Sequence, residues 1–61
     1  MQNNYRVDIF FRAICHYKVE FPEYWLAKTF AESVKDADGV EGVYILERIS
    51  DHSFDITKRI K

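Results

Sequence analysis

The thiol and imidazole side chains of this 61-residue sequence are confined to Cys15, His16 and His52. A cysteine nucleophile needs a base within hydrogen-bond reach, and a structural zinc site usually needs four cysteine or histidine ligands. Cys15 and His16 are adjacent in an alternating segment, so they point to opposite faces of a strand and cannot pair. With only Gly39 and Gly42, the chain also has no glycine-rich phosphate loop. We therefore expect a non-enzyme with no catalytic residue, no metal and no cofactor, and we interpret Cys15 as a small apolar core residue.

Basic and aromatic side chains suggest nucleic-acid binding, because rings stack on bases and Arg and Lys neutralise phosphates. The candidate stacking residues are Phe10, His16 and Tyr44. The candidate phosphate-binding residues are Arg6, Arg12, Lys18, Arg48 and Arg59. The net charge of -1 lacks the basic excess of most nucleic-acid-binding domains. Binding of RNA or single-stranded DNA is therefore the alternative function.

Aromatic and arginine side chains also fit a protein interface, where Trp and Tyr dominate hot spots and Arg forms paired hydrogen bonds. The residues predicted to bind a partner are Phe10, Arg12, Ile14, Tyr24, Trp25, Tyr44 and Arg48. The leading prediction is a small non-enzymatic protein that acts stoichiometrically on a larger protein partner, as an inhibitor, adaptor or antitoxin-like factor. A phage or mobile-element origin is suggested by the small size alone.

Residues 5–21 alternate between apolar odd positions and mainly polar even positions, which predicts β-structure with one apolar face. A straight strand of this length would span about 56 Å, whereas a compact domain of this size is only about 27 Å wide. We expect a fold-back with an odd-length loop around Arg12 to Ile14, because a three-residue loop keeps the apolar positions on one face. No Gly, Asn or Asp stands there to adopt a positive φ.

One long bent strand is the alternative interpretation of the same segment. Such a strand would project beyond the domain and pair with another chain, because it would exceed the width of a compact monomer. A homodimer built on this long first strand is therefore the second alternative function.

A helix is predicted from about Pro22 to Asp38. Proline suits the first helical position, and Gly39 suits the position after the last turn. The apolar stripe of this helix consists of Leu26, Ala27, Phe30, Ala31, Val34 and Ala37. At about 100° per residue, Trp25 lies roughly 150° from the centre of that stripe, so it is off the core face unless it packs over the sheet edge near Phe21.

The remaining residues predict a hairpin that turns at Asp51 to Ser53. The expected cross-strand pairs are Val43 with Ile60 and Ile49 with Phe54 on the inner face, and Tyr44 with Arg59 and Arg48 with Asp55 on the outer face. Leu46 is expected on the outer face. Glu47 and Lys58 fall on the inner face, which predicts that this face is incompletely covered at one end, and an edge strand could also pair with a partner.

Together these elements predict one α+β domain over residues 1–61, with a small antiparallel sheet of three to four strands, one helix packed on one face, and the order β(β)-α-β-β. Apolar residues make up 48%, which excludes a disordered chain. A single Cys excludes an internally disulfide-stapled scaffold and favours a cytoplasmic setting. No uncharged run approaches the roughly 20 residues of a membrane span and no signal peptide is apparent, so we expect no membrane association. A core of this size leaves little room for a pocket, so we expect no small-molecule substrate.

Overall fold

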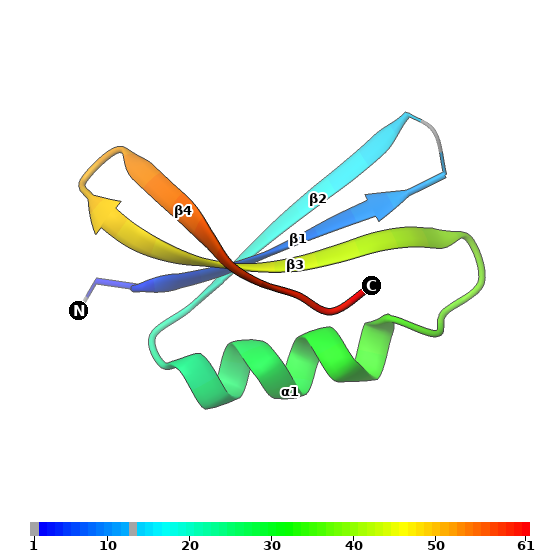
Figure 1. Cartoon of the computed structure of the whole chain (residues 1–61), viewed down its shortest axis with the longest axis horizontal. Coiled ribbons are helices and arrows are strands. Elements are labelled where there is room, and N and C mark those ends of the chain that lie inside the picture. Colours follow the sequence, from blue (N-terminus) through cyan, green and yellow to red (C-terminus); the bar gives the residue numbers. More distant parts are fainter. Residues whose placement is uncertain (1, 13) are drawn as a thin grey trace.

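The fold is an antiparallel sheet with one helix across one face, as seen in a computed structural model that describes residues 2–12 and 14–61. The elements are β1 (Tyr5–Phe11), β2 (Cys15–Phe21), α1 (Tyr24–Val34), β3 (Val40–Ser50) and β4 (Ser53–Arg59) (Figure 1). The four strands lie in the order β2-β1-β3-β4, so β1 and β3 are central and β2 and β4 are the edges. The predicted α+β class, element order and single helix are confirmed.

The first alternating segment is a hairpin rather than one long strand. Phe11 pairs with Cys15, so odd positions lie opposite odd positions, as the constant parity of the apolar positions predicted. Arg12 has a φ of 55°, which lies in the left-handed region where Gly and Asn are more usual. Ala13, at the centre of the predicted loop, lies outside the described residues. Because β1 and β2 pair with each other, the structure lacks the long first strand on which a strand-crossing dimer would depend.

The helix is shorter than predicted at both ends. Glu23 has extended backbone angles and precedes the first helical residue, so Pro22 and Glu23 form the approach to α1 rather than its first turn. The helix ends at Val34, and Ala37 is exposed. No helix within residues 2–12 and 14–61 has both the length and the apolar character needed to cross a membrane.

Gly39 lies in the connection from α1 to β3 rather than directly after the helix. Its φ of 91° is disfavoured for residues with a Cβ, and a Cβ there would lie 2.7 Å from the ring of Phe11. Its carbonyl accepts a hydrogen bond from the Arg12 backbone at 2.8 Å. The absent side chain therefore allows the connection to approach the first hairpin closely.

The second hairpin contains two register shifts that the sequence pattern did not predict. Tyr44 pairs with Arg59 as expected, and the backbone N–H of Ile60 donates to Val43 at 2.8 Å. The pairs that differ from expectation are Arg48 with Phe54 and Glu47 with Asp55, in place of Ile49 with Phe54 and Arg48 with Asp55. The shifts leave Ile49 in β3 and Thr57 in β4 without an opposite residue. Each extra residue reverses the facing of the residues beyond it, so Phe54 joins the outer face and Asp55 leaves it.

The core lies between α1 and the sheet face that carries the odd residues of β1. Val7, Val43 and Ile45 are fully buried there. Ala27 and Ala31 are the fully buried residues of α1, and their small side chains let the helix lie close to the strands. The helix does not cover this whole face, because Glu47 and Lys58 remain exposed, as predicted.

Candidate interaction surface

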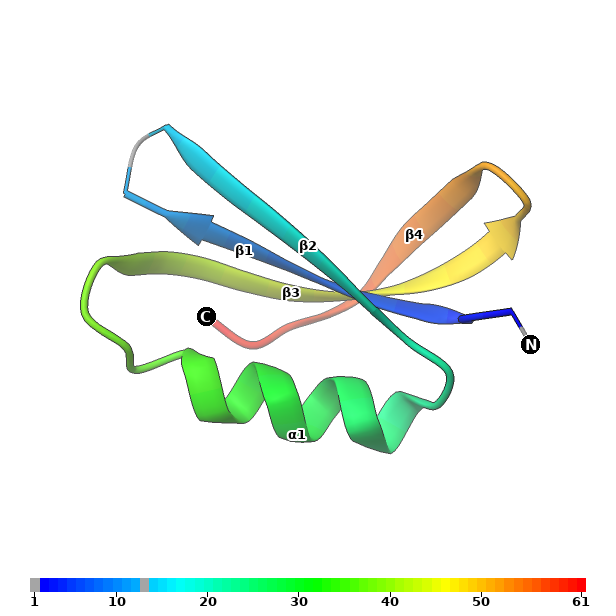
Figure 2. The same ribbon diagram turned by 180° about the vertical axis from the view of Figure 1, so that it is seen from behind.

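The sheet face turned away from α1 is called the outer face. Figures 1 and 2 show α1 on one side of the sheet and none of the other described elements against the opposite side. Strand alternation and register place on it Arg6, Asp8, Phe10, His16, Lys18, Glu20, Tyr44, Leu46, Arg48, Phe54, Ile56 and Arg59. Leu46 was expected to be exposed here, but the structure buries it, together with Asp8. The outer face is therefore partly covered by its own side chains.

Three rings form an aromatic cluster on the outer face, toward the loop end of the first hairpin: Phe10, His16 and Tyr44. The Phe10 and His16 rings are stacked with centroids 4.2 Å apart, and Phe10 and Tyr44 meet edge to face at 5.7 Å. Gly42 lies opposite Phe10 in β3, and a Cβ there would approach the Tyr44 ring to 3.3 Å. Gly42 thus provides space for Tyr44 to reach Phe10. The sequence analysis named all three rings, and the structure brings them together.

An ion cluster lies beside these rings. The Arg6 guanidinium donates two hydrogen bonds to the Asp8 carboxylate, at 2.7 and 3.0 Å. Nε2 of His16 lies 3.2 Å from the second carboxylate oxygen, an ion pair when the imidazole is protonated. Asp8 is only 6% exposed, and a buried carboxylate requires such partners. Arg6, a candidate phosphate ligand, is therefore already paired inside the chain.

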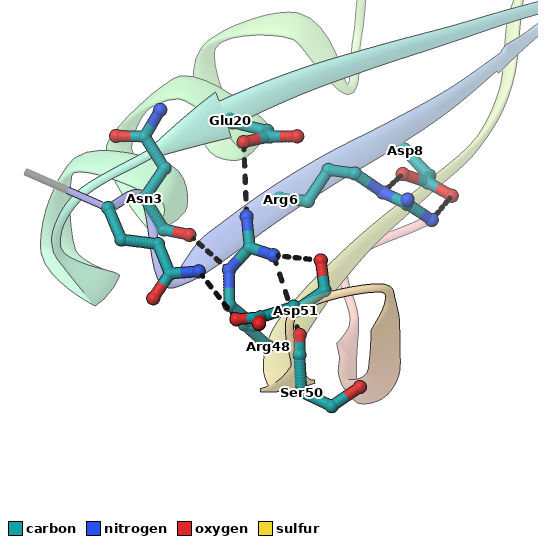
Figure 3. Close-up of polar contacts among 8 residues, drawn as sticks. Asn3, Arg6, Asp8, Glu20, Arg48, Ser50 and Asp51 are labelled. Carbon is teal, nitrogen blue, oxygen red and sulfur yellow. Dashed lines mark hydrogen bonds and ion pairs between the residues drawn. The ribbon is translucent and has the colours of Figure 1, made fainter.

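Arg48 joins the second hairpin to the start of the chain, as Figure 3 shows. Its Nε donates to the carbonyl of Asn3 at 2.7 Å, and its backbone N–H donates to the carbonyl of Asn4 at 2.7 Å. A terminal nitrogen donates to the carbonyl of Asp51 at 3.0 Å, and the other lies 3.4 Å from a Glu20 carboxylate oxygen. These bonds occupy the guanidinium, so the main role of Arg48 is structural: it connects the second hairpin to the first residues of the chain.

Phe54 was not among the predicted site residues, but it lies on the outer face between two cations. The Arg6 and Arg48 guanidinium carbons each lie 4.6 Å from the centre of its ring. Ile56, also missed, is 62% exposed on the same face. Both were overlooked because no glycine marks the bulges that set their facing.

Arg12 and Ile14 lie at the end of the first hairpin, outside both of its strands. The Arg12 guanidinium lies 5.0 Å from the centre of the Phe11 ring, and that ring packs against the core. Arg12 is therefore turned toward the inner side rather than the outer face where alternation placed it. Ile14 is exposed.

Tyr24 and Trp25 occupy the first turn of α1, on the other layer of the molecule. Tyr24 packs edge to face on Tyr5, with centroids 5.6 Å apart, and contacts the core. Trp25 is 61% exposed, and its indole N–H donates to the Glu23 carboxylate at 2.6 Å. The predicted position of Trp25 off the core stripe is thus observed. Tyr24 and Trp25 therefore lie on the helix layer, as predicted, apart from the partner-binding candidates of the sheet.

Two of the predicted phosphate-binding cations, Lys18 and Arg59, are exposed on the outer face. Lys18 takes part in no ion pair among the described residues, and the Arg59 guanidinium lies 5.8 Å from the centre of the Tyr44 ring. The aromatic cluster differs from an open stacking platform, because His16 and Tyr44 contact Phe10 from two sides. This face therefore presents three mutually packed rings together with exposed cations.

Within the part of the chain that the structure describes, no three His, Cys, Asp or Glu side chains converge to hold a metal ion, and no pocket is found. Comparison of the chain with protein-family models, with curated proteins and with solved structures gives no match.

Proposed function

We propose that this chain is a non-enzymatic protein-binding module that acts stoichiometrically on a larger protein partner and docks through its outer face. The observation that supports the proposal is the composition of this face. Aromatic rings and an exposed isoleucine, Ile56, lie where no described element covers them, while Arg6 and Arg48 are engaged inside the chain. Such a surface offers apolar area with few free cations, which suits a protein partner better than a phosphate backbone.

The geometry of the aromatic cluster also favours binding at low entropic cost. Phe10 is held between the rings of His16 and Tyr44, so its side chain is already ordered before any partner arrives. A preordered ring loses less conformational freedom on binding than a mobile side chain, and central aromatic residues dominate interface energies. Phe10 and Tyr44 are therefore the proposed anchors, with Arg59 at the rim.

Trp25 is a separate anchor in the same proposal. Its hydrogen bond to Glu23 fixes an exposed indole on the helix layer, remote from the outer face. A partner that touched both sites would have to extend around the edge of the sheet. Trp25 therefore tests whether the helix layer takes part in binding, independently of Phe10.

The experiment is capture of partners from host lysate by the tagged chain and by the variants Phe10→Ala, Tyr44→Ala and Trp25→Ala. A captured protein is then purified and titrated by calorimetry to obtain the stoichiometry. We expect Phe10→Ala and Tyr44→Ala to weaken binding at least about tenfold, the usual effect of truncating a hot spot. Circular dichroism verifies that each variant is folded. Undiminished binding by both folded variants would contradict docking through the outer face.

Binding of RNA or single-stranded DNA remains the alternative, supported by the convergence of Phe10, His16 and Tyr44 with Lys18 and Arg59 nearby. The two functions differ in their response to salt. Nucleic-acid affinity falls steeply and linearly with salt on logarithmic axes, whereas an apolar protein interface is much less sensitive. Absence of any complex with oligonucleotides at low salt would eliminate the alternative.

A further inference from the structure

The two edges of the sheet differ in how well they could accept another strand. In β4 the extra residue Thr57 interrupts the ladder, and its hydroxyl donates to the Ile45 carbonyl at 3.1 Å. The neighbouring Lys58 and Arg59 add charge, and bulges and charges are the usual protection of an edge strand. In β2 the pairing with β1 is continuous from Cys15 to Phe21, without any shift. The β2 edge therefore has no bulge, and its exposed charged side chains, Lys18 and Glu20, are of opposite sign.

The backbone bonds of β1 show which β2 groups face the solvent. Asn4 and Arg12, both even-numbered, bond through their backbone toward the β3 side, to Arg48 and Gly39 respectively. In an antiparallel ladder the bonding direction alternates along a strand, so the odd residues of β1 bond β2. The same alternation in β2 directs its odd residues to β1. The N–H and C=O groups of Lys18 and Glu20 then point away from the sheet.

We propose that β2 pairs antiparallel with β2 of a second copy of this chain, with Val19 opposite Val19, so that two sheets join into one. A two-fold axis perpendicular to the sheet keeps each side chain on its own face, so only registers centred on one residue are allowed. Centring on Val19 places Lys18 opposite Glu20 of the second copy, twice. The outward backbone groups of these residues then bond one another.

The side chains on both faces support this register. On the outer face, both cross-strand Lys18–Glu20 pairs join opposite charges. On the inner face, Tyr17 meets Phe21 of the second copy. Tyr17 is 54% exposed in the single chain, and Phe21 already packs against Phe30 with ring centroids 5.2 Å apart. Pairing would therefore cover the exposed Tyr17 side chain and add it to the packed rings of Phe21 and Phe30.

The neighbouring symmetric registers are less favourable. Centring on Lys18 would place two lysines directly opposite each other, and centring on Glu20 would do the same with two glutamates; like charges across a ladder are destabilising. Centring on Tyr17 would oppose Lys18 to His16, which also removes the attractive pair. The charge pattern of β2 thus favours the register centred on Val19. This register makes a second copy of the chain the partner of β2.

Charge reversal provides the first test, by sedimentation velocity up to high micromolar concentration. We expect a dimer for the natural chain and a rise of about tenfold or more in its dissociation constant for Lys18→Glu or Glu20→Lys alone. Mixing these two variants restores attraction at both pairs, so the mixture forms heterodimers. The double variant K18E/E20K also dimerises. Lys58→Glu, which reverses a charge on the other edge strand, leaves the dimer unchanged.

Disulfide trapping provides the second test and reports the register directly. Odd residues form the non-hydrogen-bonded pairs of the new ladder, whose Cα atoms lie about 4.5 Å apart, within the reach of a disulfide. In a Cys15→Ser background, Val19→Cys should therefore oxidise to a covalent dimer, whereas Tyr17→Cys should not. The proposal is overturned by a monomer at every concentration, by a dimer indifferent to the charge variants, or by preferential linking through Tyr17→Cys. These measurements need no partner protein, so they succeed or fail independently of the proposed function.

Discussion

The two faces of the sheet are stabilised in different ways. On the inner face, Val7, Val43 and Ile45 are fully buried against the alanines of α1. On the outer face, the described part of the chain supplies no covering helix, and burial is achieved by side chains of the sheet itself. There the carboxylate of Asp8 is surrounded by an arginine and a histidine.

This difference shows how one helix can suffice for a four-stranded sheet. Apolar packing is not directional, so the inner face needs only matched volumes. The outer face depends on hydrogen bonds and ion pairs, which are directional and are lost if one partner is removed. These bonds leave the aromatic rings of the face partly accessible. The inner face therefore carries most of the apolar burial, whereas the outer face keeps partly exposed rings.

The largest effect is expected at the centre of the inner face. Ile45→Ala removes a fully buried side chain and should lower the free energy of unfolding by about 3 kcal/mol, through lost burial and a residual cavity. Urea denaturation measures the change. Ile56→Ala, the same substitution at an exposed site of the outer face, is the control and should cost less than about 1 kcal/mol. Equal losses would show that the two faces do not differ.

The second effect concerns the ion cluster. Asp8→Ala leaves the Arg6 guanidinium without its carboxylate partner and should cost about 2 kcal/mol, as expected for hydrogen bonds to a charged group. Asp38→Ala, at an exposed acidic residue, provides the control in the same denaturation experiment. A loss for Asp8→Ala no greater than for the control would mean that packing alone stabilises the outer face.

A smaller effect is expected at the aromatic cluster. Phe10→Ala removes the ring that contacts both His16 and Tyr44 and should cost about 1 kcal/mol. Trp25→Ala removes an exposed ring of the helix layer and should cost less than about 0.5 kcal/mol. Thermal unfolding of both variants checks the order. A reversed order would indicate that Trp25, rather than Phe10, supports the fold.

The smallest effect is expected on the solvent side of α1. The Lys35 ammonium, hydrogen-bonded to Glu32 at 2.9 Å, lowers the pKa of that carboxyl from its usual 4.5. Because the pKa is lower in the folded state, the stabilisation is present above pH 4.5 and is lost as the pH falls through the folded value. Glu32→Gln should therefore lower the melting temperature slightly at neutral pH and leave it unchanged in strong acid. A difference that persists in acid would contradict the ion pair.

Much of the inner face was predictable from the sequence, whereas the outer face was predictable only in part. The alternation of residues 5–21, with apolar side chains at odd positions, identified the hairpin and the parity of its loop. A loop one residue longer or shorter would turn the apolar side chains of one strand to the opposite face of the sheet. The stripe around Ala27 and Ala31 identified the helix, although Glu23 adopts an extended conformation and the first turn starts later.

The remaining features depend on contacts that side-chain identity does not encode. The bulges at Ile49 and Thr57 carry no glycine, so the facing of Phe54 and Ile56 could not be read from the pattern. Arg48 bonds to backbone carbonyls, which every residue possesses, so its partners Asn3 and Asn4 left no signal in the sequence. Charge and residue type identified the candidates, and only the register decided which of them remain accessible.

The strand order also has a consequence for how the chain folds. The sheet consists of two hairpins, each closed by a short local loop, joined along β1 and β3 by pairs such as Val7 with Ile45. Hairpins form in microseconds. The pairing of β1 with β3, called the seam, must bring together residues separated by the whole helix, so its loop-closure entropy cost is larger. The seam should therefore form late and set the cooperativity of folding. Its amide hydrogens should exchange with solvent only when the entire molecule opens, while those of β4 exchange through local fraying.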